Sequence, residues 1–251
     1  MTYENQTVLI TGASSGIGAA IAKRFAAAGY ELLLLGRDEQ KLEKVKSECN
    51  NLKTETLAFD LADFTNHQTI LKNKLSELAP VSIVVNCAGV FHQSTFEETT
   101  DDIWLHQFQV NFFSAVQLVQ FLWPTFKKNR KGSVVNIAST LGIKPTAHTT
   151  AYSAAKAAMI NWTLSLAQDG GLHNIRANCI CPGIVDTPIH QFHFMDPEQK
   201  KESTNQILKM QLLQELGKPE DVAEAAFFLG SDLSRWTTGS LLNVDGGIHI
   251  K

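Results

Sequence analysis

The sequence lacks the segments that mark membrane proteins, secreted proteins and nucleic-acid-binding proteins. None of its apolar stretches reaches about 18 residues, the length that a membrane-spanning helix needs. The first residues, Met1 to Gln6, are polar and show no charged and then apolar signal pattern. Lysine and arginine form no long run, and the formal net charge is −3, so nothing indicates a nucleic-acid partner. We therefore expect a soluble, cytoplasmic protein that binds neither membranes nor nucleic acids.

Cysteine and histidine do not occur in the patterns that metal sites require. The four cysteines, at positions 49, 87, 179 and 181, include no Cys-x-x-Cys pair. The eight histidines show no His-Glu-x-x-His or similar ligand spacing. Cys179 and Cys181 lie in an apolar run, where a free thiol behaves as a small hydrophobic group. We predict buried thiols and no metal site.

The chain also shows no repeat, low-complexity linker or break in composition, which favours one domain over residues 1–251. Short apolar runs alternate with longer segments of helical period. The runs are mostly continuous, as in strands that are covered on both faces. They are Thr7–Ile10, Glu31–Leu35, Thr56–Phe59, Val81–Val85, Ser133–Ile137, Ile175–Ile180 and Leu241–Val244. This alternation predicts an α/β fold, a Rossmann-like doubly wound sheet of about seven parallel strands flanked by helices.

The segments between these runs are helix candidates. They are Gly16–Ala28, Glu39–Glu48, His67–Leu78, Asp102–Lys128, Tyr152–Gln168 and Pro219–Leu229. Within the longest of them, Pro124 is expected to kink or break the helix. Residues 187–216 form the least regular stretch, and a loop of that length is typical of a functional lid. We predict that they form a substrate-binding lid within the single domain.

One predicted strand runs directly into a glycine-rich turn and then into a helix. The turn reads Thr11-Gly12-Ala13-Ser14-Ser15-Gly16-Ile17-Gly18. Gly12 allows the chain to turn sharply, and Gly16 and Gly18 leave room where a pyrophosphate and the sheet approach. The N-terminus of the following helix offers unpaired amides and a positive dipole end. The glycines alone would fit a tight turn without a ligand, but the strand before and the helix after favour dinucleotide binding.

Tyr152 and Lys156 are four residues apart in a helical segment, so both project from one face. A free tyrosine, with a pKa of about 10, is a poor base near neutrality, but a neighbouring ammonium lowers that pKa. Ser139 follows an apolar strand at the end where ligands bind in such sheets. Alone, these residues would be a helix-surface pair and a strand-end hydrogen bonder. Together with the glycine turn they predict proton transfer by Tyr152. No Gly-x-Ser-x-Gly elbow surrounds Ser139, which disfavours a serine hydrolase.

In this order the motifs resemble those of the short-chain dehydrogenases/reductases, classical type, over residues 6–249. The resemblance rests on the glycine turn, Asp60, Asn86-Cys87-Ala88-Gly89, Asn111, Ser139, Tyr152-Ser153-Ala154-Ala155-Lys156, Pro182-Gly183 with Thr187, and Val244-Asp245-Gly246-Gly247. It implies an oxidoreductase that moves a hydride between NAD(P)(H) and a carbonyl or secondary alcohol. It further implies that Tyr152 is the acid/base, that Ser139 holds the substrate oxygen and that Lys156 also binds the nicotinamide ribose. Asn111 would support a water-mediated proton path from a helix irregularity.

The same resemblance assigns the cofactor to residues along the carboxyl ends of the strands. They are Gly12, Ser14, Ser15, Gly16, Ile17, Gly18, Arg37, Asp60, Leu61, Asn86, Ala88, Gly89, Tyr152, Lys156, Pro182, Gly183, Val185 and Thr187. Gly36 stands where members that prefer NAD usually carry aspartate, and Arg37 could pair with a 2′-phosphate. NADP(H) is therefore favoured. NAD(H) stays an alternative, because Ser15 replaces the basic residue that many NADP-dependent relatives carry in the turn.

The substrate-binding residues are expected within Val90–Phe96, Leu141–Thr150 and Thr187–Met210. The candidates are Ser139, Tyr152, His92, Ile143, His148 and His190. An apolar lining with a few polar groups suits a medium-sized, partly hydrophobic carbonyl or alcohol. By resemblance, the Tyr152–Lys156 spacing favours carbonyl chemistry over alkene reduction.

Two further expectations concern alternatives and assembly. A catalytically silent nucleotide-binding sensor or scaffold of the same fold is the alternative function, although a pure binder would not need Ser139, Asn111, Tyr152 and Lys156 together. The resemblance also implies a homotetramer or homodimer, assembled through the helix Asp102–Lys128 and the helix that begins at Tyr152.

Overall fold

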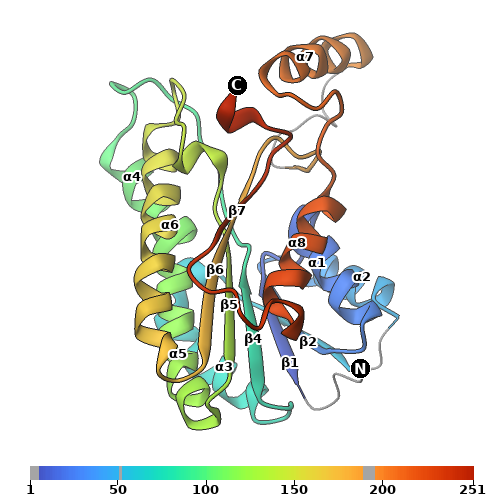
Figure 1. The fold of residues 1–251 in the computed structure, drawn as a ribbon, viewed down its shortest axis with the longest axis vertical. Coiled ribbons are helices and arrows are strands. Elements are labelled where there is room, and N and C mark those ends of the chain that lie inside the picture. Colours follow the sequence, from blue (N-terminus) through green and yellow to red (C-terminus); the bar gives the residue numbers. More distant parts are fainter. Residues whose placement is uncertain (1–5, 51–52, 189–195) are drawn as a thin grey trace.

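Seven parallel strands form one sheet in the computed structural model, which describes residues 6–50, 53–188 and 196–251 (Figure 1). The strands are β1 (Thr7–Thr11), β2 (Glu31–Gly36), β3 (Thr54–Ala58), β4 (Val81–Asn86), β5 (Gly132–Ile137), β6 (Ile175–Pro182) and β7 (Leu241–Val244). Their order in the sheet is β3-β2-β1-β4-β5-β6-β7. The order reverses between β1 and β4, the place where ligands bind in open α/β sheets. The predicted doubly wound parallel sheet is confirmed.

Helices cover both faces of this sheet (Figure 1). One face carries α1 (Gly16–Ala27), α2 (Glu39–Glu48) and α8 (Pro219–Gly230), and the other carries α3 (Phe64–Leu75), α4 (Asp101–Phe108), α5 (Ser114–Asn129) and α6 (Thr150–Gly171). The remaining helix, α7 (Pro197–Met210), lies beyond the end of the sheet, beside the C-terminus of the chain. In the described part of the chain, no helix has the length and apolar character needed to cross a membrane.

The core consists of two apolar layers, one on each face of the sheet. Leu32 and Leu34 of β2 pack into the layer under α1 and α8, whereas Leu33 and Leu35 pack into the opposite layer. All four side chains are fully buried. Successive side chains of a strand point to opposite faces, so a strand that is covered on both sides must be apolar throughout. This explains why the strands appear in the sequence as continuous apolar runs.

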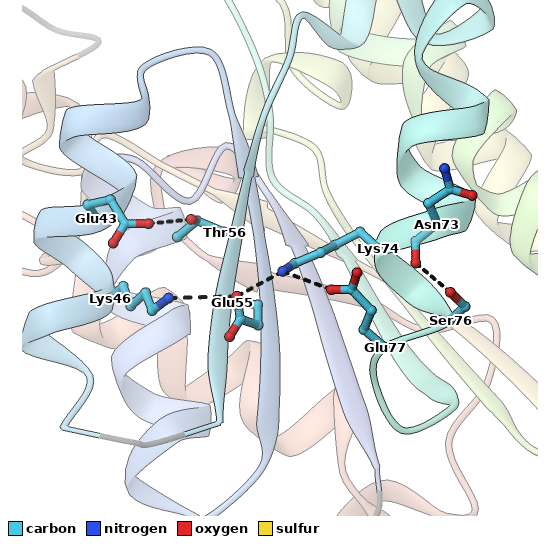
Figure 2. Close-up of polar contacts among 8 residues, drawn as sticks. All are labelled: Glu43, Lys46, Glu55, Thr56, Asn73, Lys74, Ser76 and Glu77. Carbon is cyan, nitrogen blue, oxygen red and sulfur yellow. Dashed lines mark hydrogen bonds and ion pairs between the residues drawn. The ribbon is translucent and has the colours of Figure 1, made fainter.

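Charged side chains from two helices surround the edge strand β3. Lys74 of α3 lies 2.9 Å from the carboxylate of Glu55, and Lys46 of α2 lies 3.7 Å from the same group (Figure 2). The next residue of the strand, Thr56, donates a hydrogen bond to Glu43 of α2. Ion pairs that stay partly exposed to water, as these do, add little stability. They do place charge along an edge whose free backbone groups could otherwise pair with another chain.

Three predicted boundaries on this side of the sheet were wrong by two or three residues. The strand begins at Thr54 rather than Thr56, and α3 spans Phe64–Leu75 rather than His67–Leu78. Phe64 is buried, so the helix starts as soon as the 3₁₀ turn at Leu61–Asp63 ends. At the other end, the hydroxyl of Ser76 donates to the carbonyl of Asn73 at 2.6 Å and helps to close the last turn (Figure 2).

Of the kink or break predicted at Pro124, the break does not occur. α5 continues through Pro124, while the irregularity lies earlier, at the π-helix Gln109–Phe113. Proline removes the hydrogen bond to the residue four positions before it, here Gln120. Both Pro124 and Gln120 are exposed, so water can replace the missing donor.

The predicted lid segment has more regular structure than we expected. It contains α7, which begins with a capping box in which Asp196 accepts hydrogen bonds from the backbone of Glu198 and Gln199, each at 3.0 Å. Pro197 occupies the first helical position. Asp-Pro-Glu-Gln is a helix-start signal that our reading of the sequence overlooked. Residues 189–195 lie outside the described residues.

The close packing of α1 on the turn after β1 gives a test of the fold. A Cβ atom at Gly18 would lie 2.2 Å from the carbonyl oxygen of Gly12. We expect Gly18→Ala to lower the free energy of unfolding by about 2–3 kcal/mol, because α1 must move away from the turn. Urea denaturation followed by circular dichroism measures the change.

Gly171→Ala is the matched control for this substitution. A Cβ atom at Gly171, at the end of α6, would have nothing within 4 Å. This variant should match or slightly exceed the wild type in stability, since alanine restricts the unfolded chain. Equal stability of the two variants would contradict the packing argument.

Candidate active site

A cavity of about 720 Å³ opens at the carboxyl ends of the strands. Its walls come from the turn after β1, from the ends of β2, β4, β5 and β6, and from α6. Most of the residues predicted to bind a cofactor line it: Gly12, Ser14, Ser15, Gly16, Ile17, Gly18, Arg37, Asp60, Leu61, Ala88, Gly89, Tyr152, Lys156, Pro182, Gly183, Val185 and Thr187. The fold therefore brings together residues from the whole length of the chain.

The glycine turn makes a close backbone contact with the end of β4. Gly12 has a φ of +65°, and a Cβ atom there would lie 2.8 Å from the backbone nitrogen of Ala88. The hydroxyl of Thr11 accepts hydrogen bonds from the backbone of Cys87 and Ala88, both at 3.0 Å. Only glycine combines this backbone angle with such a close approach.

The N-terminus of α1 faces the same cavity. Its N-cap, Ser15, makes no side-chain capping hydrogen bond, and its first turn contains no acidic residue. The first amides of a helix have no partner within the helix and carry the positive end of the dipole. This end of α1 is therefore suited to an anionic group such as a pyrophosphate.

The wall beyond β2 is formed by Gly36 and Arg37, with Asp60 and Leu61 nearby in the cavity lining. Asp38 does not line the cavity. Its carboxylate accepts the backbone N–H of Lys41 at 3.0 Å and so caps α2. This bond and a second one from the side chain of Lys41 lower the pKa of Asp38.

The opposite wall carries the predicted catalytic groups. Ser139 follows β5, and its Oγ accepts the backbone N–H of Leu141 at 3.1 Å. Tyr152 lies in the first turn of α6, and the ring of Phe91 meets its ring edge-on, with centroids 4.8 Å apart. Lys156, one turn later, donates from Nζ to the carbonyl of Ile137 at 3.0 Å. Its Nζ lies 5.7 Å from the centre of the Tyr152 ring. The side chains of Ser139, Tyr152 and Lys156 are all at least nine-tenths buried.

Comparison with known proteins agrees with this geometry. A family model described as enoyl-(acyl carrier protein) reductase matches residues 12–249. The 3-oxoacyl-(acyl-carrier-protein) reductase of Chlamydia trachomatis is 31% identical over 247 residues, which cover 97% of each chain. The 7alpha-hydroxysteroid dehydrogenase of Bacteroides fragilis is 30% identical over 253 residues, covering 99% of this chain and 96% of the relative. The chain belongs to the short-chain dehydrogenase/reductase superfamily.

Solved structures of the superfamily superpose closely on this chain. A short-chain dehydrogenase/reductase from Burkholderia thailandensis has a TM-score of 0.88 and 34% identity, covering 98% of this chain and 93% of its own. A 4-hydroxyisoleucine dehydrogenase complexed with NADH has a TM-score of 0.89 and 27% identity, covering 98% and 99%. The protein is thus an NAD(P)-dependent oxidoreductase acting on carbonyl or alcohol groups.

Burial dominates the electrostatics of the catalytic wall in this short-chain dehydrogenase/reductase. It raises the pKa of Tyr152 to about 12, against the opposing effect of a hydrogen bond with Ser139. It also lowers the pKa of Lys156 to about 8. The expected lowering of the Tyr152 pKa by Lys156 is therefore not achieved by the protein alone, because the charged form of each group loses its hydration in the cavity.

Asn111 lies behind the cavity wall in the π-helix, so the expected helix irregularity is present at this residue. Its side chain is fully buried. Asn111 Oδ1 accepts the backbone N–H of Val90 at 3.1 Å, and Nδ2 donates to the carbonyl of Val90 at 3.0 Å. Asn111 does not line the cavity itself, but it holds Val90, which does.

Several predicted residues do not reach the cavity. Asn86 is buried inside the sheet, where its Nδ2 donates to Oδ1 of Asn136 on β5 at 2.8 Å. It joins two strands rather than lining the cofactor site. His92, Ile143 and His148 are exposed and are not among the lining residues. The carbonyl of His148 accepts the backbone N–H of Ser94 at 3.1 Å, so the two loops meet through their backbones. His190 lies outside the described residues.

The sequence reasoning missed part of the lining. Phe91, Gln93, Leu141, Thr146, Thr149 and Met210 fall within the predicted segments, whereas Phe59, Cys87, Val110 and Ile248 were not assigned to the site. Phe59 and Cys87 directly follow strands and could have been found from that position. Ile248 reaches the cavity because the chain end folds back, with Gly246 accepting the backbone N–H of Leu212 at 2.8 Å. No local pattern signals such a contact.

The shifted pKa of Lys156 predicts a pH-dependent stability that needs no substrate to measure. Between about 8 in the folded protein and the ordinary 10.5, the unfolded chain binds more protons than the folded one. The buried ammonium therefore costs stability below pH 8, and the cost disappears as the pH rises towards 10.5. We expect Lys156→Met to be more stable than the wild type at pH 7, with the difference shrinking by about 2 kcal/mol at pH 10.

Urea denaturation between pH 7 and 10 measures this difference. Lys128→Met, at an exposed lysine near the end of α5, serves as the control and should show a difference that does not vary with pH. A Lys156→Met difference that stays constant or grows with pH contradicts the assignment.

Proposed function

We propose that this short-chain dehydrogenase/reductase uses NADPH to reduce a neutral, partly hydrophobic ketone or aldehyde to an alcohol. Tyr152 supplies the proton, Ser139 holds the substrate oxygen and Lys156 assists Tyr152. The observation that carries the proposal is the placement of these three buried side chains on one wall of a cavity whose other wall is the glycine turn of α1.

The residues around the cavity fit a dinucleotide. The amides at the start of α1 would hold the pyrophosphate, with Asp60 and Leu61 beside the adenine. Lys156 would hold the nicotinamide ribose, and Val185 and Thr187 would hold the carboxamide. When bound, the nicotinamide ring supplies or accepts the hydride.

The preference for NADP(H) rests on the end of β2. The carboxylate of Asp38 is occupied as the cap of α2, so it is not placed to bind a ribose hydroxyl. Arg37 is exposed on the cavity wall, where a guanidinium can pair with a 2′-phosphate. The complex of 4-hydroxyisoleucine dehydrogenase with NADH belongs to the same fold. Because that relative binds NADH with the same fold, the fold alone does not select NADPH. The selection in this protein must come from individual residues such as Arg37.

The protonation state of the catalytic wall favours reduction. With its pKa raised to about 12 by burial, Tyr152 keeps its proton at neutral pH and can donate it to the oxygen of a carbonyl. Ser139 can donate a hydrogen bond to the same oxygen. Lys156, with a pKa of about 8, stays positive at neutral pH and stabilises the phenolate that the proton transfer leaves.

The substrate class follows from the lining near Tyr152. Phe91, Leu141, Met210 and Ile248 are apolar, and Gln93 is polar but neutral. Among the described residues that line the cavity, the charged ones are Arg37, Asp60 and Lys156, which we assign to the cofactor or the proton. A neutral substrate therefore fits best. The spacing of Tyr152 and Lys156 favours a carbonyl over the alkene that the description of the family model would imply.

The proposal includes a cytoplasmic homodimer or homotetramer. Leu105, Phe113 and Leu164 are exposed on α4, the π-helix and α6, the helices expected to pair. Apolar side chains exposed on neighbouring helices support a protein interface. The four cysteines are free thiols, as is usual in a reducing compartment.

Replacement of the catalytic phenol tests the mechanism. The wild type is first assayed at 340 nm, the absorbance band of reduced nicotinamide, over ketones, aldehydes, hydroxysteroids, sugars and 3-oxoacyl thioesters. On the best substrate, Tyr152→Phe should lower kcat by about 100-fold or more, because the proton donor is lost. Binding of NADPH, followed by fluorescence, should be retained.

Tyr30→Phe removes the same hydroxyl from a tyrosine buried in the core, away from the cavity, and should keep the wild-type kcat. Unchanged turnover in Tyr152→Phe would sink the mechanism. A wild type that binds NADPH but turns over no member of the panel would favour the silent sensor instead.

The cofactor preference is tested separately at Arg37. Arg37→Ala should raise the KM for NADPH about 10- to 100-fold and leave the KM for NADH nearly unchanged, because a charge-assisted contact to phosphate is lost. Steady-state kinetics with both cofactors measure this. Arg235→Ala, at an exposed arginine after α8, is the control. Equal efficiency with both cofactors in wild type and Arg37→Ala would refute the preference.

A further inference from the structure

Gln107 is a buried polar side chain that the proposed mechanism does not use. It lies in the last turn of α4, and its side chain is 2% exposed. Its Oε1 accepts a hydrogen bond from Nδ2 of Asn111 at 3.0 Å, across the start of the π-helix. A polar group is rarely buried so deeply without a specific partner. Here the partner is the amide that holds Val90 on the cavity wall.

The hydrogen bonds of Asn111 show what Gln107 contributes. An amide nitrogen has two N–H groups, and its oxygen can accept. One N–H and the oxygen of Asn111 form a closed pair with the backbone of Val90. The second N–H is directed to Gln107. Without that oxygen, a fully buried N–H of Asn111 would lose its hydrogen-bond partner. The energetic cost of the unpaired N–H would favour rotation of the Asn111 side chain.

A rotation of Asn111 would be transmitted directly to the catalytic wall. A Cβ atom on Gly89 would lie 2.9 Å from Asn111 Oδ1 and 3.6 Å from Nζ of Lys156. The backbone of Gly89 is therefore packed between the amide oxygen and the ammonium, with no side chain to absorb a shift. Val90, held by Asn111, is the next residue of the cavity wall.

We propose that Gln107 is a positioning residue for proton transfer. By fixing the amide of Asn111, it holds the backbone of Gly89 and Val90 against Lys156. The inference rests on the proposed function of Tyr152 and Lys156. It assigns to a side chain outside the cavity a measurable part in kcat.

A second glutamine in the same region gives a contrast. Gln109, at the start of the π-helix, donates from Nε2 to the carbonyl of Ala62 at 3.1 Å. Ala62 follows Asp60 and Leu61, which line the far part of the cavity. Loss of this bond should weaken NADPH binding, whereas loss of the Gln107 bond should slow turnover.

The experiment compares Gln107→Met, which removes the acceptor at similar length, with Gln107→Glu, which keeps an acceptor oxygen. We expect Gln107→Met to lower kcat about tenfold, while the carbonyl KM and the NADPH Kd change less than about twofold. The basic limb of the kcat profile, where Lys156 loses its proton, should move to higher pH, because a looser wall relieves the burial that lowers the pKa of Lys156. Gln107→Glu should restore most of the lost kcat at neutral pH.

Matched variants separate this role from a general loss of structure. Gln120→Met, at an exposed glutamine of α5, should behave as the wild type. Gln109→Met should raise the NADPH Kd without moving the pH profile. If Gln107→Met does not fold, Gln107→Asn takes its place, because it keeps the amide but shortens its reach by one methylene group.

The outcomes distinguish this inference from the proposed function. Wild-type kcat and an unmoved basic limb in Gln107→Met or Gln107→Asn would overturn the inference, even with Tyr152→Phe inactive. Full turnover in Tyr152→Phe would instead overturn the proposed function. A reduced kcat in Gln107→Met with an unmoved pH profile would mean a structural role only, and would also overturn the inference.

Discussion

The contact between the turn after β1 and the end of β4 determines where the site lies. Gly12 packs against the backbone of Ala88 there, and the hydroxyl of Thr11 accepts hydrogen bonds from the backbone N–H groups of Cys87 and Ala88. This contact occurs where the strand order reverses, so the amides of α1 and the backbone of Gly89 share one cavity. A larger residue at Gly12 would separate the N-terminus of α1 from the wall to which we assign the proton transfer.

The same enclosure sets the chemistry of that wall. Burial acts on Tyr152 and Lys156 in opposite directions, raising the pKa of the phenol and lowering that of the ammonium. The Tyr152 phenol therefore keeps its proton at neutral pH, next to the Lys156 ammonium, which loses its proton more easily than an ordinary lysine. This arrangement suits a Tyr152 that donates a proton. Our expectation from sequence treated Lys156 as the dominant influence on Tyr152. That expectation did not take account of the burial of both side chains. Their burial depends on residues distant in sequence, such as Phe91, whose ring packs against Tyr152.

Much of the fold and of the cavity lining could be predicted from the residues, and the misses have physical causes. Continuous apolar runs identified the strands because both faces of the sheet are covered. Asn86 does not line the cavity because its side chain faces Asn136, its partner in the register of β4 and β5, which a single sequence does not reveal. His148 does not line the cavity either: its backbone, with a φ of 64°, lies in the left-handed region and its side chain is exposed.

The long helical segment shows why a strong local signal can mislead. Pro124 has the clearer helix-breaking chemistry, yet α5 passes through it at a solvent-exposed position. The π-helix forms instead at Gln109–Phe113, where no proline or glycine demands it. An irregular turn there is sustained by tertiary bonds, since Gln109 reaches Ala62 and Asn111 reaches Val90 on different parts of the cavity wall. Such turns are frequent at functional sites, because a helix distorted by its neighbours can direct side chains that a regular helix would not.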